Sequence, residues 1–274
     1  MSSTDYATDF GYHSVLAAVV FALVYLPIFL WFVFQSVKNT TYVYISLSVF
    51  CLMRVAAFGL RAVLIKSTSL GENLNVFIAD EVMFGVGFFA LLYSAFTLVL
   101  DREIMSGAGP TNNLPLKIMR DRRMFRVVLI IGIALGVMGI SDSTSSNPSK
   151  ASSGVTLHRA STIIFLVLTG IQALQTALMF QTTRRTSYAH LSFGDRHGNF
   201  ILVLISIFLL VREVFMTATI NNAGRQDEEL LWYPFIAVPE VLAVICYAVP
   251  GLVPARSELK KLQADAEYAL PLRG

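Results

Sequence analysis

Residues 14–37, SVLAAVVFALVYLPIFLWFVFQSV, contain no charged side chain. A helix needs about 20 consecutive apolar residues to cross a bilayer core, and this stretch exceeds that length. Lipid offers no partner to a free backbone amide, so the stretch predicts a membrane-spanning helix. The first 13 residues carry Asp5 and Asp9 but no Lys or Arg, unlike a cleaved signal peptide. We therefore expect this first helix to be retained.

Six further apolar runs follow along the 274-residue chain. They are Tyr42–Ile65, Leu74–Leu100, Phe125–Ile140, Arg159–Phe180, Asn199–Ile220 and Leu230–Gly251. The run Phe125–Ile140 is the shortest, so its helix is expected to extend into the flanking residues. Two connectors have loop compositions: Ser141–Val155 is rich in Ser, and Ser106–Asn113 carries two Gly and one Pro.

The composition points the same way, since 55% of the residues are apolar and only 14% are charged. About a quarter of a typical soluble domain is charged, so a soluble domain, a disordered chain and a coiled coil are all excluded. The sequence predicts an all-α, multi-pass membrane protein with seven transmembrane helices. Residues 1–13 are expected to form a short extramembrane N-terminus, residues 14–251 one transmembrane domain, and residues 252–274 a tail.

Lys and Arg gather on one side of the predicted spans, and this bias sets the orientation. If the N-terminus is outside, the inner side carries 13 of them: Lys38, Arg102, Lys117, Arg120, Arg122, Arg123, Arg184, Arg185, Arg196, Arg256, Lys260, Lys261 and Arg273. The outer side then carries Lys66, Lys150 and Arg225. We therefore expect an outer N-terminus and a cytosolic C-terminus. The net charge of +3 reflects this topology, and the expected partner is the lipid bilayer, not nucleic acid.

Seven ionisable side chains fall well inside the predicted spans. They are Arg54, Arg61, Asp80, Glu81, Arg212, Glu213 and Glu240. A charged group near the bilayer midplane costs about 2.5–3.5 kcal/mol on insertion scales, so such groups usually face the bundle interior. We expect all seven to meet in one polar chamber between the midplane and the outer face. The alternative is that the arginines and carboxylates only pin neighbouring helices together.

Four acids share only three arginines, so at least one carboxyl is expected to lack an arginine partner. Burial disfavours the charged form of such a group and makes it a proton donor for general-acid chemistry. Glu240 is the first choice, since it follows Pro239 and lies close to Pro234. Proline removes a helix hydrogen bond and loosens the preceding turn, which would leave a backbone carbonyl free to face a cavity. The prolines could equally serve only to bend the helix.

The remaining candidates are polar or aromatic groups that could contact a bound molecule. Gln172 lies on a polar face of the fifth run, Tyr93 on an aromatic stripe of the third, and Tyr233 at the outer end of the seventh. The candidate substrate contacts are thus Arg54, Arg61, Arg212, Gln172, Tyr93 and Tyr233, and the candidate catalytic acids and bases are Glu240, Asp80, Glu81 and Glu213. All four histidines fall in loops or at span ends, and neither they nor the two cysteines show metal-type spacing. We expect no metal and no cofactor.

The last two runs resemble those of fungal seven-span proteins that include the RTA-type lipid-translocating exporters. The resemblance lies in residues 210–215 (LVREVF), Glu229, residues 232–235 (WYPF) and residues 249–251 (VPG). It implies lipid or drug export. The chain departs from the family pattern where Glu213 directly follows Arg212, because the family acid comes several residues later.

In size and span number the chain is also similar to the membrane-bound terpene cyclases of fungal meroterpenoid pathways, of the ascofuranone–ascochlorin type. This resemblance implies proton-initiated cyclisation of an epoxidised or unmodified prenyl chain by buried acids in secondary metabolism. On this hypothesis Glu240 or Asp80 is the acid, and Glu81 or Glu213 is the later base.

Asp101-Arg102-Glu103 resembles the acidic-Arg-aromatic box of G-protein-coupled receptors, with Glu103 in the aromatic position. Three functions therefore stay open. The first is a cyclase acting on a hydrophobic prenylated substrate, the second is a lipid exporter or flippase, and the third is a seven-transmembrane receptor.

Overall fold

The apolar runs fold into helices in the computed structural model, which describes residues 12–67, 70, 73–105, 120–145, 147–183, 193–226 and 228–258. The six long helices are α2 (Val15–Lys38), α3 (Tyr42–Lys66), α5 (Leu74–Met105), α7 (Arg122–Ser143), α8 (Pro148–Thr183) and α9 (Phe193–Ala218). The seventh span joins α11 (Glu229–Trp232), a π-helical turn η1 (Tyr233–Ala237) and α12 (Val238–Tyr247), after the short α10 (Ala223–Gln226). Within these residues seven segments are long and apolar enough to cross a membrane. The all-α, seven-span prediction is confirmed.

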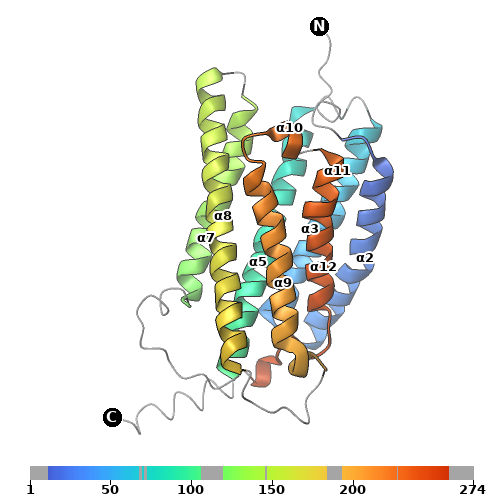
Figure 1. Cartoon of the computed structure of the whole chain (residues 1–274). Helices are drawn as coiled ribbons and strands as arrows, with labels where there is room; N and C mark the ends of the chain where they lie inside the picture. Colours follow the sequence, from blue (N-terminus) through green and yellow to red (C-terminus); the bar gives the residue numbers. More distant parts are fainter. Residues whose placement is uncertain are drawn as a thin grey trace.

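The helices run alongside one another as a single bundle (Figure 1). We call the end where α2 begins the upper end and the end where α12 finishes the lower end, as drawn in Figure 1. α5 is the central helix, since it contacts α3, α7, α8 and α9. In the most apolar stretch of α5, 72% of the residues are buried. In the corresponding stretch of α2, which lies at the edge of the bundle, 17% of the residues are buried. The side chains of α5 are therefore the ones best placed to line an interior site.

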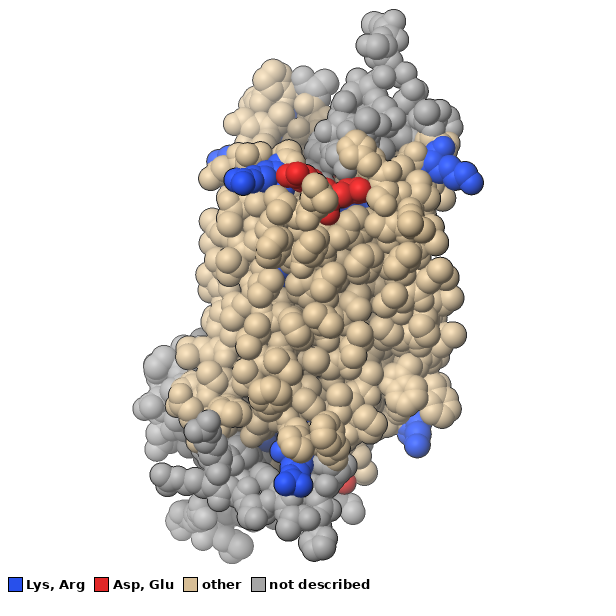
Figure 2. All heavy atoms as spheres, turned by 45° about the vertical axis from the view of Figure 1, so that its right-hand side comes forward, with Lys and Arg blue, Asp and Glu red and all other residues tan. Residues whose placement is uncertain are grey.

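The outer surface of the bundle suits a bilayer. In the face drawn in Figure 2, Lys, Arg, Asp and Glu gather at the two ends, and the band between them is almost free of these residues. Large apolar side chains such as Leu23, Phe34 and Ile163 are exposed at this bundle surface. Exposed apolar area of this extent is stable only against lipid. The protein is a multi-pass membrane protein.

The loop expected over Ser141–Val155 is wrong. α7 continues to Ser143 and α8 begins at Pro148. The Asn147 side chain accepts a hydrogen bond from the backbone N–H of Ser149 at 3.1 Å, and Pro148 occupies the first helical position, where its missing N–H is not needed. Local capping therefore outweighs the Ser-rich composition. The expected extension of the fourth run into its flanks is confirmed by α7.

α7 and α8 pack backbone to backbone because two glycines face each other between them. A Cβ atom on Gly154 would lie 2.3 Å from the backbone nitrogen of Ser143, and one on Gly139 would lie 2.5 Å from that of His158. These distances leave no room for any side chain. The two helices are thus held as a close pair that positions His158 on the inner side of α8.

Gly154→Ala is expected to lower the thermal unfolding temperature of the detergent-solubilised protein, because α7 has to move to admit the methyl group. Gly170→Ala on the same helix is the matched control, since nothing lies within 4 Å of its Cβ. Alanine favours a helix over glycine by about 1 kcal/mol, so the control should unfold at the same or a higher temperature. An equal response of the two variants contradicts the close packing.

At the lower end, Arg102 ties three segments together. Its guanidinium donates to the backbone carbonyls of Leu252 (2.9 Å), Gly251 (2.9 Å) and Gly194 (3.0 Å). The neighbouring acids Asp101 and Glu103 form ion pairs with Arg122 and Arg120. The Asp101-Arg102-Glu103 sequence is accounted for by these contacts.

Candidate functional site

Glu240 lies at the centre of a buried ion-pair network, which we call the Arg54 cluster (Arg54, Arg212, Glu213 and Glu240). Arg54 donates to both carboxylate oxygens of Glu240, each at 2.7 Å, and Arg212 Nε donates to Oε1 at 2.8 Å. Arg212 also pairs with Glu213. Glu240 and Arg54 are at most 1% exposed. The network joins α3, α9 and α12 through two arginines and two carboxylates, whose charges balance.

A second network lies closer to the upper end, and we call it the Arg61 cluster (Tyr12, Arg61, Asp80 and Glu81). Arg61 donates to Asp80 Oδ2 at 2.8 and 3.0 Å, to Glu81 Oε1 at 3.3 Å and to the Tyr12 hydroxyl at 2.9 Å. The Tyr12 hydroxyl donates to Glu81. Asp80 is fully buried, and its Oδ1 has no hydrogen-bond partner. The Tyr12 hydroxyl thus bridges Arg61 and Glu81 within this cluster.

One aromatic ring separates the two clusters. The guanidinium carbons of Arg54 and Arg61 lie 4.8 and 4.2 Å from the centre of the Phe84 ring. The expected single chamber is therefore replaced by two networks with a phenyl ring between them.

The expectation that one carboxyl lacks an arginine partner is also wrong. Each of Asp80, Glu81, Glu213 and Glu240 pairs with an arginine. Glu240, the first choice for an unpaired acid, is held by two. A buried arginine is stable only if its charge is compensated, so the arginines take up every nearby carboxylate.

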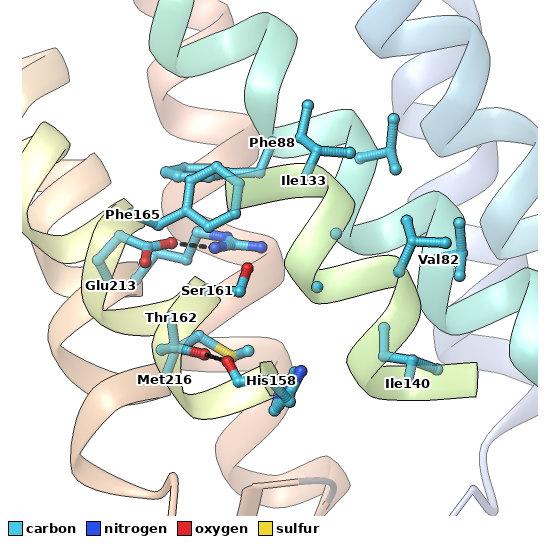
Figure 3. A pocket seen from close by; sticks show the side chains of 15 residues that line it. Val82, Phe88, Ile133, Ile140, His158, Ser161, Thr162, Phe165, Glu213 and Met216 are labelled. Carbon is cyan, nitrogen blue, oxygen red and sulfur yellow. Dashed lines mark hydrogen bonds and ion pairs between the residues drawn. The ribbon is translucent and has the colours of Figure 1, made fainter. Parts of the chain in front are cut away.

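A cavity lies beside the Arg54 cluster, between α5, α7, α8 and α9 (Figure 3), and its volume is about 60 Å³. Most of its wall is apolar. Its polar members are His158, Ser161, Thr162, Arg212 and Glu213, and the aromatic members are Phe88 and Phe165. Figure 3 shows the Glu213 carboxylate on one side of this space, where it forms an ion pair with Arg212. Arg54, Arg61, Asp80 and Glu240 do not line it.

A wider space of about 270 Å³, which we call the mouth, adjoins this cavity toward the upper end. The two spaces share Ile140 and His158 in their walls. The mouth is otherwise lined by Phe77, Glu81, Ser143, Thr144, Val155, Arg159, Ile220 and Gln226. Of the seven predicted ionisable residues, Glu81 thus faces the mouth, and Arg212 and Glu213 face the cavity.

His158 is a site residue that the sequence analysis missed. Its Nδ1 is buried without a hydrogen-bond partner, at the junction of the cavity and the mouth. It was assigned to a span end because the apolar run begins at Arg159, whereas α8 begins at Pro148, ten residues before His158. The signal that could have found it is the helical spacing of His158, Ser161 and Thr162 on one face, read together with the cap at Asn147.

Besides Arg54 and Arg61, three predicted substrate contacts lie outside both spaces. Gln172 donates to Ser206 (3.0 Å) and Thr176 (3.1 Å), which joins α8 to α9. The Tyr93 hydroxyl accepts hydrogen bonds from Arg126 at 2.6 and 3.2 Å. The Tyr233 ring stacks on Phe21 with centroids 5.2 Å apart. These three residues contact other helices, and the cavity does not use them.

Among the described residues, no group of three or more His, Cys, Asp and Glu side chains is arranged to hold a metal ion. Comparison with protein families gives one informative match: the model described as Domain of unknown function (DUF7702) covers residues 10–253. No curated protein and no solved structure matches the chain.

Proposed function

We propose a function for this chain, which belongs to the DUF7702 family, from the cavity between α5, α7, α8 and α9. The proposed function is that of an intramembrane cyclase acting on a hydrophobic prenyl chain. The observation that carries it is that Glu213, a buried acid, and His158 line the same otherwise apolar cavity. Small apolar sites with a few convergent polar groups are the usual form of a ligand or active site.

In the proposed reaction His158, as imidazolium, gives its proton to the epoxide oxygen at the end of the substrate chain. The C–O bond breaks, and a cation forms on the neighbouring carbon. An alkene π pair attacks this cation and forms a C–C bond, which moves the positive charge along the chain. The Glu213 carboxylate then removes a proton from the adjacent carbon, whose C–H pair becomes a C=C bond. The product is an isomer of the substrate, and the proton returns to His158 for the next turnover.

The surroundings of Glu213 and of the migrating cation favour these roles. Arg212 binds Glu213, which stabilises the carboxylate needed in a base. The ring of Phe165 lines the cavity, and its π face can stabilise a passing cation, whereas the Phe88 ring already stacks with the Arg212 guanidinium. The earlier choice of Glu240 or Asp80 as acid is replaced by His158, since both carboxylates are held by arginines and neither lines the cavity.

The direct test is turnover in membranes. Microsomes from a host that expresses the chain are given an epoxyfarnesyl phenol, and the appearance of a cyclised product of unchanged mass is followed by chromatography and mass spectrometry. His158→Ala is expected to lower the initial rate about 100-fold, because general-acid help is lost. Gln172→Leu, which alters α8 outside the cavity, should keep turnover. Absence of product from wild-type membranes, or full activity of His158→Ala, contradicts the proposal.

Lipid export is the second candidate, and one observation favours it. Below the cavity, the inner faces of α8 and α9 carry further buried polar side chains, Thr169, Gln172, Thr176 and Ser206. A polar row of this kind could guide a head group through the bundle. In that case a deletion strain should lose efflux of a labelled sphingoid base, and the chain carrying Gln172→Leu should fail to restore it. A cyclase predicts normal efflux in both strains.

A further inference from the structure

The cavity and the mouth form one bipartite space. Both have Ile140 and His158 in their walls, so the two spaces meet at these two side chains. Along α5 the lining runs from Phe77 in the mouth to Phe88 in the cavity, which corresponds to about 16 Å of helix at 1.5 Å per residue. An extended alkyl chain of about a dozen carbon atoms has a similar length to this stretch of helix.

The two parts differ in chemistry. The deep part is walled by Ile133, Val137, Phe88 and Phe165, and the charged groups beside it, Arg212 and Glu213, neutralise each other. Burying an alkyl or prenyl chain there is favourable by about 25 cal/mol per Å² of apolar surface. The deep part therefore suits the apolar portion of a ligand.

The mouth offers a cation. Arg159 is exposed in its wall and makes no ion pair or hydrogen bond within the described part of the chain. The one carboxylate of the mouth, Glu81, is already bound by Arg61 and by the Tyr12 hydroxyl. The Ser143 and Thr144 hydroxyls donate to carbonyls of their own helix. A guanidinium that no described residue binds, beside a carboxylate that already accepts two hydrogen bonds, favours an anionic head group.

We propose that this space takes an amphiphile with an anionic oxygen-acid head at Arg159 and an apolar tail that runs through the mouth into the deep part, about a dozen carbons for the length that the two parts span together. The inference rests on the proposed function only in taking this space as the substrate site. It adds the substrate class, a hydrophobic chain whose head is a carboxylate or a phosphate. A cationic amphiphile is disfavoured, because Glu81 already accepts hydrogen bonds from Arg61 and from the Tyr12 hydroxyl.

Binding without turnover tests this. The full chain is purified into nanodiscs of neutral phosphatidylcholine, and displacement of tritiated laurate is measured with laurate, dodecyl phosphate, dodecanol and dodecylammonium. The two anions should compete at least about tenfold better than the alcohol, as expected for a charge-assisted contact, and their ranking tells carboxylate from phosphate. A laurate with a photoreactive terminal carbon should label peptides that contain Ile133–Val137 or Phe165.

Arg159→Gln should weaken laurate binding about tenfold and leave dodecanol unchanged. Arg225→Gln is the matched control, an exposed cation near the same end that does not line the mouth. Equal competition by dodecanol, equal loss in both variants, or labelling confined to other helices overturns the inference. A chain that binds laurate through Arg159 but forms no cyclised product keeps this inference and removes the cyclase.

Discussion

Glu240→Gln is expected to lower the free energy of unfolding by about 3–5 kcal/mol, the range seen when one partner of a buried ion pair is removed. The variant keeps the size of the side chain, so no cavity is made. It leaves Arg54 and Arg212 with one carboxylate, Glu213, between them. The measurement is unfolding of the detergent-solubilised protein in a denaturant series followed by tryptophan fluorescence, because Trp232 is buried in the bundle.

Two further variants test whether the loss of stability comes from the missing Glu240 charge. Glu228→Gln is the matched control, an exposed glutamate at the upper end, and its effect should stay within about 0.5 kcal/mol. Arg54→Met combined with Glu240→Gln leaves Arg212 paired with Glu213, so the double variant should be more stable than Glu240→Gln alone. The free energy of unfolding of the double variant is compared with those of Arg54→Met and Glu240→Gln. If the double variant loses as much stability as the two single variants together, the network does not act as a charge-balanced unit.

Glu213→Gln is expected to slow formation of the cyclised product by about 100-fold or more, in line with the loss of a general base. Glutamine keeps the volume and can still accept a hydrogen bond from Arg212, but it cannot take the final proton. The rate of product formation in microsomes measures this, with the amount of folded protein determined on the same membranes by size-exclusion chromatography.

The products that Glu213→Gln forms give a second measurement for this prediction. A cation that finds no base is expected to be captured by water, so the variant should give a hydroxylated product whose mass exceeds that of the substrate by one water. Glu228→Gln should show the wild-type rate and product. Wild-type turnover by Glu213→Gln would remove Glu213 from the reaction and leave it a partner of Arg212 only.

The spans could be predicted because each depends on local information. An uncharged run long enough for the bilayer has to be helical, and this holds for residues 14–37 whatever their neighbours are. The prediction failed at Ser141–Val155, where a cap at Asn147 and the close contact of Gly139 with Gly154 extend two helices through a Ser-rich stretch. Contacts between helices are not visible in composition.

The candidate site was predicted in part. The sequence selected the buried ionisable residues, because the cost of a charge in lipid marks them individually. It could not tell which carboxylate each arginine binds, since Glu240 and Arg54 are 186 residues apart. His158 was missed for the same reason, because its place in the cavity depends on how α8 packs against α5, α7 and α9.

By itself, the sequence determined that the chain is a seven-span, all-helical membrane protein and that its interior holds acids and arginines. These follow from the length of apolar runs and from the free energy of moving a charge out of water, both of which act residue by residue. The tertiary structure alone decided that the seven predicted ionisable residues form two networks on either side of Phe84 and that, of these seven, Arg212, Glu213 and Glu81 line the cavity or the mouth. Ion pairing and cavity shape depend on distances between helices, which packing fixes.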